Sequence, residues 1–135
     1  MNVASLELCK ELYELSGWNE EPDYIWATTY GQPYKLVPRT VIGKDLIQAL
    51  KQKSFIIPAY DLGYLLRKLP YKVYDDYSAW VYGYKLMPTA STGWKIWYGE
   101  VGTDSEMYFN SAETPEDAAC KLAIELFKQG VLKSE

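Results

Sequence analysis

The chain has 135 residues, with 14 lysines and arginines, 18 aspartates and glutamates, two cysteines and no histidine. Its length and its 48% hydrophobic content predict one compact folded domain over residues 1–135 rather than a disordered chain. The lack of histidine excludes imidazole acid–base catalysis, Ser-His-Asp and Cys-His nucleophiles, and histidine-ligated zinc or haem.

The first half of the chain predicts helices around one strand. Leucines recur at helical spacing over residues 5–16, and Gly17 supplies a left-handed stop. Residues 23–30 are rich in β-branched and aromatic side chains, which indicates a strand. Two short amphipathic helices are expected over residues 44–53 and 61–69.

Residues 71–110 have the pattern of a β-meander. Its clearest strands are expected over residues 77–87, 94–101 and 106–110, separated by turn-forming segments rich in Gly, Ser and Thr. Alternation along the last two strands favours a core face of Ile96, Met107 and Phe109, which leaves Lys95, Trp97 and Tyr108 outward. The register of the first strand stays open.

The last helix has the strongest local signals. Thr114 is expected at the N-cap, Pro115 at N1 and Gly130 at the end. The order α-β-α-α-β-β-β-α predicts an α+β fold: an antiparallel meander of three to five strands packed against N- and C-terminal helices, with two short helices inserted in the middle. Helix, strands and helix over residues 61–129 match the order of the double-stranded-RNA-binding module, but the acids at 116–117 would repel phosphate.

Charge is distributed unevenly. Residues 31–74 carry eight bases and two acids, a net charge of +6. Residues 1–30 carry one base and six acids, and residues 75–135 carry five bases and ten acids, so each end has −5. A basic middle in an acidic chain predicts a local anion site; the alternative is that the middle helices have lysine-rich solvent faces.

The aromatic content, with 13 Tyr and 5 Trp, is also high. An outward cluster of rings beside a lysine could stack on a nucleotide base, or could meet a partner protein or a second copy of the chain. The expected ligand-binding side chains are those that would neutralise phosphate or stack: Lys35, Arg39, Arg67, Lys68, Lys72, Lys95, Tyr34, Tyr71, Trp80 and Trp97.

Other chemistry is less favoured. Cys9 and Cys120 have neither CxxC spacing nor histidine neighbours, so two buried reduced thiols are expected, with no metal and no cofactor. The acids at 20–23 and 75–76 are expected to be solvated loop charges. No secretory signal or membrane span is recognised, which predicts a cytoplasmic protein.

Three segments, residues 5–18, 57–70 and 114–130, resemble small uncharacterised proteins encoded by bacteriophages and prophages. The resemblance covers about a third of the chain and implies a counter-defence factor that binds a component of the host cytoplasm.

The leading hypothesis is therefore a non-catalytic protein that sequesters a small anionic, nucleotide-like host ligand. The alternative is a protein inhibitor that docks on a basic host protein through the acids Glu7, Glu11, Glu14 and those at 20–23. A histidine-free enzyme using Asp75 or Asp76 is least favoured, binding to nucleic acid is not expected, and self-association is left open.

Overall fold

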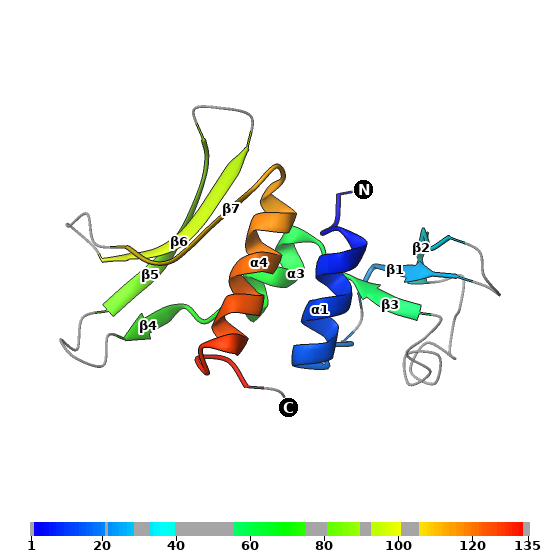
Figure 1. Cartoon of the computed structure of the whole chain (residues 1–135), viewed down its shortest axis with the longest axis horizontal. Helices are drawn as coiled ribbons and strands as arrows, with labels where there is room; N and C mark the ends of the chain where they lie inside the picture. The colour runs from blue at the N-terminus through cyan, green and yellow to red at the C-terminus, as the bar shows by residue number, and fades with distance from the viewer. Residues whose placement is uncertain are drawn as a thin grey trace.

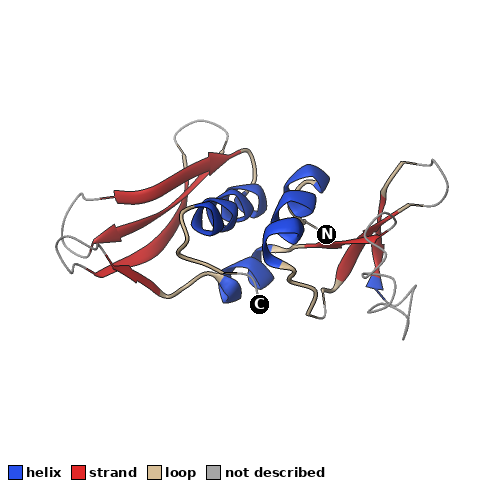
Figure 2. Ribbon diagram, turned by 60° about the horizontal axis from the view of Figure 1, so that its bottom comes forward, coloured by secondary structure: helices blue, strands red, loops and turns tan. Residues whose placement is uncertain are grey.

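The computed structural model describes residues 2–20, 22–28, 33–39, 56–74, 81–89, 93–100 and 106–133. The described residues confirm the α+β class, with two antiparallel sheets and three helices among them. The helices lie together in the middle of the molecule, with one sheet at each end (Figures 1 and 2). The helix expected over residues 44–53 falls outside the described residues.

Local sequence signals set the ends of the helices. The first, α1 (Leu6–Ser16), is capped by the Ser5 hydroxyl, which accepts the Leu8 N–H, and it ends at Gly17 with a φ of 68°. The third predicted helix is α3 (Leu62–Lys68). In α4 (Pro115–Lys128), the Thr114 side chain accepts the Asp117 N–H, so the expected N-cap is confirmed.

The smaller sheet has the order β2-β1-β3, formed by β1 (Tyr24–Ala27), β2 (Lys35–Pro38) and β3 (Ile56–Ala59). The sequence pattern did not predict β3, because it is short and contains Pro58. Proline has no N–H for a ladder, but β3 is an edge strand, where one side needs no partner.

The larger sheet is the predicted meander, with the order β4-β5-β6-β7. Its strands are β4 (Lys72–Tyr74), β5 (Val81–Pro88), β6 (Trp94–Glu100) and β7 (Glu106–Ala112). The strand of residues 23–30 was expected to join one antiparallel sheet, but β1 instead pairs with β2 and β3 in a sheet of its own.

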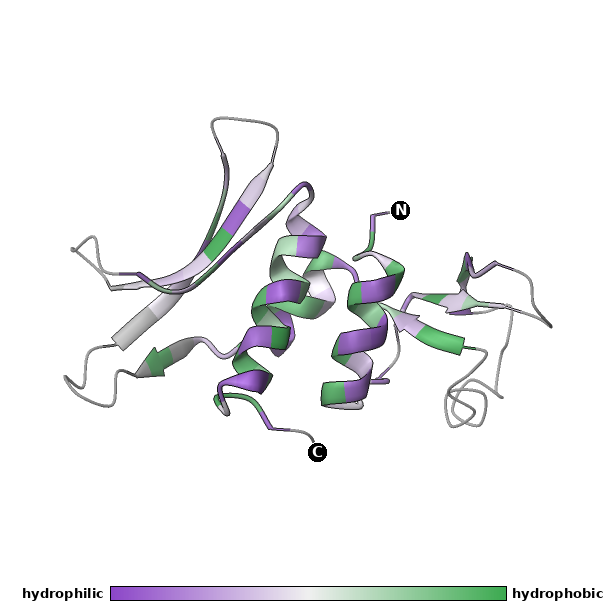
Figure 3. Cartoon of the chain, viewed as in Figure 1, coloured by the Kyte–Doolittle hydropathy of each residue, from purple (hydrophilic) through white to green (hydrophobic). Residues whose placement is uncertain are grey.

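The main core lies where the three helices meet the larger sheet. α4 packs on α1 and α3 and lies along β7 and β6 (Figure 1). Hydrophobic and hydrophilic residues form alternate stripes on α1 and α4 (Figure 3), as expected for helices with one buried face. The Asp117 carboxylate accepts the Ser5 N–H at 2.7 Å and so joins the start of α4 to the start of α1.

The two thiols are both free and buried, on α1 and α4. Burial away from water raises the pKa of Cys9 from 9.0 to about 11, and the pKa of Cys120 also rises for the same main reason. Because the thiolate is the reactive form, these groups are chemically quiet and serve as small apolar core residues.

The predicted faces of Tyr108 and Phe109 on β7 are wrong, because the strand contains a β-bulge. The β6–β7 register shifts between Ile96 and Tyr98, and Tyr108 has a φ of 56°. The bulge reverses the alternation at Phe109, which is 49% exposed instead of buried. Tyr108, expected outward, packs against the main core instead.

Candidate functional site

The larger sheet has two faces of different character. One is covered by α4 and carries Ile96 and Tyr98, which are fully buried. The opposite one, here called the outer face, is made by side chains of β5, β6 and β7: Lys85, Met87, Lys95, Trp97 and Phe109. Met87 and Phe109 are 45% and 49% exposed and are two of the four large hydrophobic side chains exposed among the described residues.

Pairing between β5 and β6 brings the two lysines together on the outer face. Lys85 stands opposite Trp97, and Lys95 stands opposite Met87. The Lys95 ammonium lies 4.8 Å from the centroid of the Trp97 ring, within range of a cation–π interaction. The tilted rings of Trp97 and Phe109 have centroids 6.4 Å apart, so aromatic contact continues onto β7.

The Trp97 and Lys85 side chains pack over Gly99. A Cβ placed on Gly99 would lie 3.1 Å from Trp97 Nε1 and 3.2 Å from Lys85 Cε. The indole and the lysine stem therefore lie over the bare backbone of Gly99, and a larger residue there would push them away. Glu106, opposite Gly99 in the register, places one exposed acid at the rim.

Trp97 is not the open stacking platform expected from the sequence. It lies on the outer face, as predicted, but it is only 7% exposed. Tyr84, which shares a strand face with Tyr82 and Trp80 by alternation, packs against the main core. Trp80 itself lies outside the described residues. Phe109 is the exposed ring of this face.

The predicted basic residues do not meet at one site. Lys35 begins β2 and Arg39 follows it, at the end of the molecule far from the larger sheet (Figure 1). Arg67 and Lys68 lie on α3. Of Lys72, opposite Gly83 on β4, the structure describes only the backbone. A single site that uses all the predicted bases is therefore not formed by the described residues.

Several of these side chains are engaged within the protein. Lys68 forms an ion pair with Glu20 at 2.7 Å, and its ammonium lies 5.5 Å from the centroid of the Trp18 ring. Tyr34, predicted to stack on a ligand, instead carries the Lys10 ammonium over its ring at 4.6 Å. These interactions would have to break before either side chain could bind an anion.

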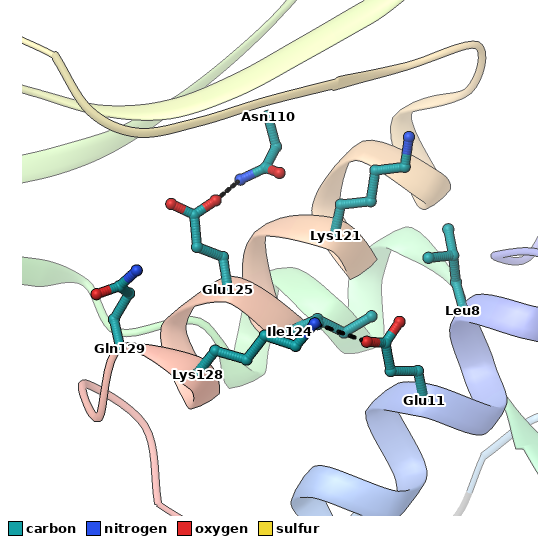
Figure 4. A pocket seen from close by; sticks show the side chains of 8 residues that line it. All are labelled: Leu8, Glu11, Asn110, Lys121, Ile124, Glu125, Lys128 and Gln129. Carbon is teal, nitrogen blue, oxygen red and sulfur yellow. Dashed lines mark hydrogen bonds and ion pairs between the residues drawn. The ribbon is translucent and has the colours of Figure 1, made fainter.

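A polar groove of about 370 Å³ lies between α1, α4 and β7 (Figure 4). Its charged side chains have partners within the protein. Lys128 pairs with Glu11 at 2.9 Å, and Glu125 accepts a hydrogen bond from the Asn110 amide at 2.7 Å. Lys121 donates to the Ser111 carbonyl at 3.3 Å. Both lysines of the groove thus already have partners within the protein.

Neither a metal centre nor a membrane span is found in the described part of the chain. No three side chains of metal-ligating type gather there. None of its helices has the length and apolar character needed to cross a bilayer.

Together, fold and site define an α+β protein with a meander sheet covered by helices on one face and bearing lysines and apolar side chains on the other. Comparison with protein-family models, curated proteins and solved structures finds no match to the chain.

Sequence reasoning found Lys95 and Trp97 but missed Lys85, Met87 and Phe109. The alternation in β5 could have indicated Lys85 and Met87, whereas the bulge hid Phe109.

Proposed function

We propose that this chain is a non-catalytic binding protein whose ligand is anionic and lies on the outer face of the larger sheet. The observation that carries the proposal is the pair Lys85 and Lys95, set beside the exposed Met87 and Phe109. Two ammonium groups attract an anion, and the apolar side chains add contact area that excludes water.

Binding is favoured over catalysis by the placement of reactive groups. The sequence contains no histidine, and the thiols of Cys9 and Cys120 and the hydroxyl of Tyr60 have raised pKa values because they are buried. Groups held neutral inside the core cannot exchange protons with a substrate on the surface. The resemblance to phage-encoded proteins favours a host component as the ligand and a counter-defence role.

Reversing both outer-face charges tests this proposal. The variant Lys85→Glu/Lys95→Glu is expected to bind an anionic probe about tenfold more weakly or worse, because attraction becomes repulsion. The measurement is isothermal calorimetry with linear and cyclic nucleotides and with a peptide that alternates valine and glutamate.

Lys35→Glu provides the matched control, since Lys35 is exposed on β2 in the other sheet. It changes net charge in the same direction and should leave affinity within about twofold, as expected for a distant surface charge. Absence of heat with every probe would contradict the proposal. So would a loss of affinity in Lys35→Glu equal to the loss in the single variants Lys85→Glu or Lys95→Glu.

A second candidate, inhibition of a basic host protein, is favoured by one observation. Glu7 and Glu14 are both exposed on α1 and are spaced to share one helix face. Glu11 and Glu20, also expected in that surface, already pair with lysines of the chain. If Glu7→Lys/Glu14→Lys abolishes capture of a host protein while reversal of the outer-face lysines does not, this candidate replaces the first.

A further inference from the structure

The strand β5 has an open edge for part of its length. β4 pairs only with Val81, Tyr82 and Gly83 of β5. From Tyr84 to Pro88, β5 pairs with β6 on one side, and none of the described residues pairs with it on the other. Backbone N–H and C=O groups of a strand point alternately to its two sides, so this edge presents groups that no described strand pairs with.

The edge opens because the chain leaves the sheet just before β4. The Tyr98 hydroxyl donates to the Pro70 carbonyl at 2.7 Å, which fixes the chain between α3 and β4. Tyr71 projects into solvent with 83% of its surface exposed, and its ring centroid lies 6.3 Å from that of Tyr84. If the β4–β5 register continued, Tyr71 would stand opposite Tyr84 and Pro70 opposite Lys85, and Pro70 has no N–H to donate to β5.

Side chains on the two faces of this edge differ in character and would suit a strand that alternates acidic and apolar residues. On the outer face lie Lys85 and the exposed Met87, with Lys95 on the adjacent strand. On the opposite face, Tyr84 and Leu86 are partly buried against the main core and offer apolar contact. A strand added here would meet positive charge on one face and apolar surface on the other.

We propose that the open edge of β5, from Tyr84 to Pro88, binds an extended acidic peptide as an added strand. This inference rests on the proposed function and specifies its ligand class. Acidic residues of the peptide would lie beside Lys85, on the same sheet face as Lys95 one strand further in. Apolar residues in between would lie beside Tyr84 and Leu86, and backbone hydrogen bonds would fix the peptide's register.

Charge favours such a peptide over a second copy of this chain. Two β5 edges paired about a two-fold axis normal to the sheet would place two copies of the Lys85 and Lys95 pair on one continuous face. Like charges on neighbouring strands destabilise the pairing. An acidic strand instead brings opposite charge beside Lys85.

Backbone methylation of the peptide tests the added strand. The probe alternates valine and glutamate, and two controls carry N-methyl groups either at every valine or at every glutamate. A strand turns alternate amides toward its neighbour, so one control should bind about tenfold more weakly while the other keeps most of its affinity. Hydrogen exchange should slow, when the unmodified peptide binds, at those amides of Tyr84–Met87 that point away from β6.

The outcomes separate this inference from the function on which it rests. If nucleotides bind in a manner dependent on Lys85 and Lys95 but the peptide does not, the peptide ligand is wrong and the anion-binding function stands. If both methylated peptides bind as well as the parent, charge alone holds the peptide and the added strand is wrong. If no anionic probe binds, the proposed function itself fails.

Discussion

Replacing Leu122 by alanine is expected to lower the free energy of unfolding by about 2–5 kcal/mol. Leu122 lies in the middle of α4, is fully buried, and belongs to the main core shared by the helices and the larger sheet. Alanine is an excellent helix former, so the loss would come from packing and cavity formation rather than from helix propensity. Urea unfolding followed by circular dichroism measures it.

The neighbouring residue supplies the control. Lys121 is exposed on the same helix, and Lys121→Ala should change stability by no more than about 0.5 kcal/mol. A loss below about 1 kcal/mol for Leu122→Ala would show that α4 is not packed into the core. The sheet that carries the outer face would then lack the helix that covers its other side.

Stability is expected to fall steeply above pH 9. Burial raises the pKa of Cys9 from 9.0 to about 11 and raises that of Cys120 in the same direction, while the unfolded chain would titrate both thiols near 9.0. Between those values the unfolded state binds fewer protons than the folded state, so stability decreases as pH rises. Below pH 9 both states are protonated and this loss is absent.

The effect is large because several groups act together. Each thiol removes about 1.4 kcal/mol per pH unit, so the two would remove about 5 kcal/mol between pH 9 and 11. Tyr60 and Tyr98, whose pKa values burial raises from 10.0, add to the loss at the upper end. That sum is a large part of the stability of a typical domain, so a marked drop in the free energy of unfolding is expected by pH 11.

Circular dichroism and urea titrations at stepped pH would measure this loss. The variant Cys9→Ala/Cys120→Ala is the control: whatever its stability at neutral pH, its unfolding free energy should decline less between pH 9 and 10. Equal stability of the unmodified chain at pH 8 and pH 11 would mean that these side chains are not buried as described.

Local signals made much of this fold predictable from sequence. Gly17 ends α1 through a left-handed conformation that glycine adopts at no steric cost, and Thr114 with Pro115 begins α4. These features act within a few residues, so sequence alone shows them. The strand β3 was missed because its Pro58 is acceptable only at a sheet edge, which depends on the pairing of distant segments.

The candidate site was harder to predict, because its composition depends on tertiary pairing. Lys95 and Trp97 were placed correctly on one strand face, but the bulge at Tyr108 decided that Phe109 would join them. The basic middle of the sequence suggested a single site, yet Lys68 turns to Glu20 and Lys35 lies in another sheet. Net charge along a sequence does not show which side chains the fold brings together.

Chemical footprinting of lysines would locate the binding face on the protein. The rate of amine acetylation at each lysine would be compared with and without the tightest-binding anionic probe. A ligand on the outer face would make Lys85 and Lys95 slower to react, while Lys35 and Lys121 keep their rates. Protection of Lys35 or Lys68, with Lys85 and Lys95 unchanged, would contradict this location and place the ligand elsewhere.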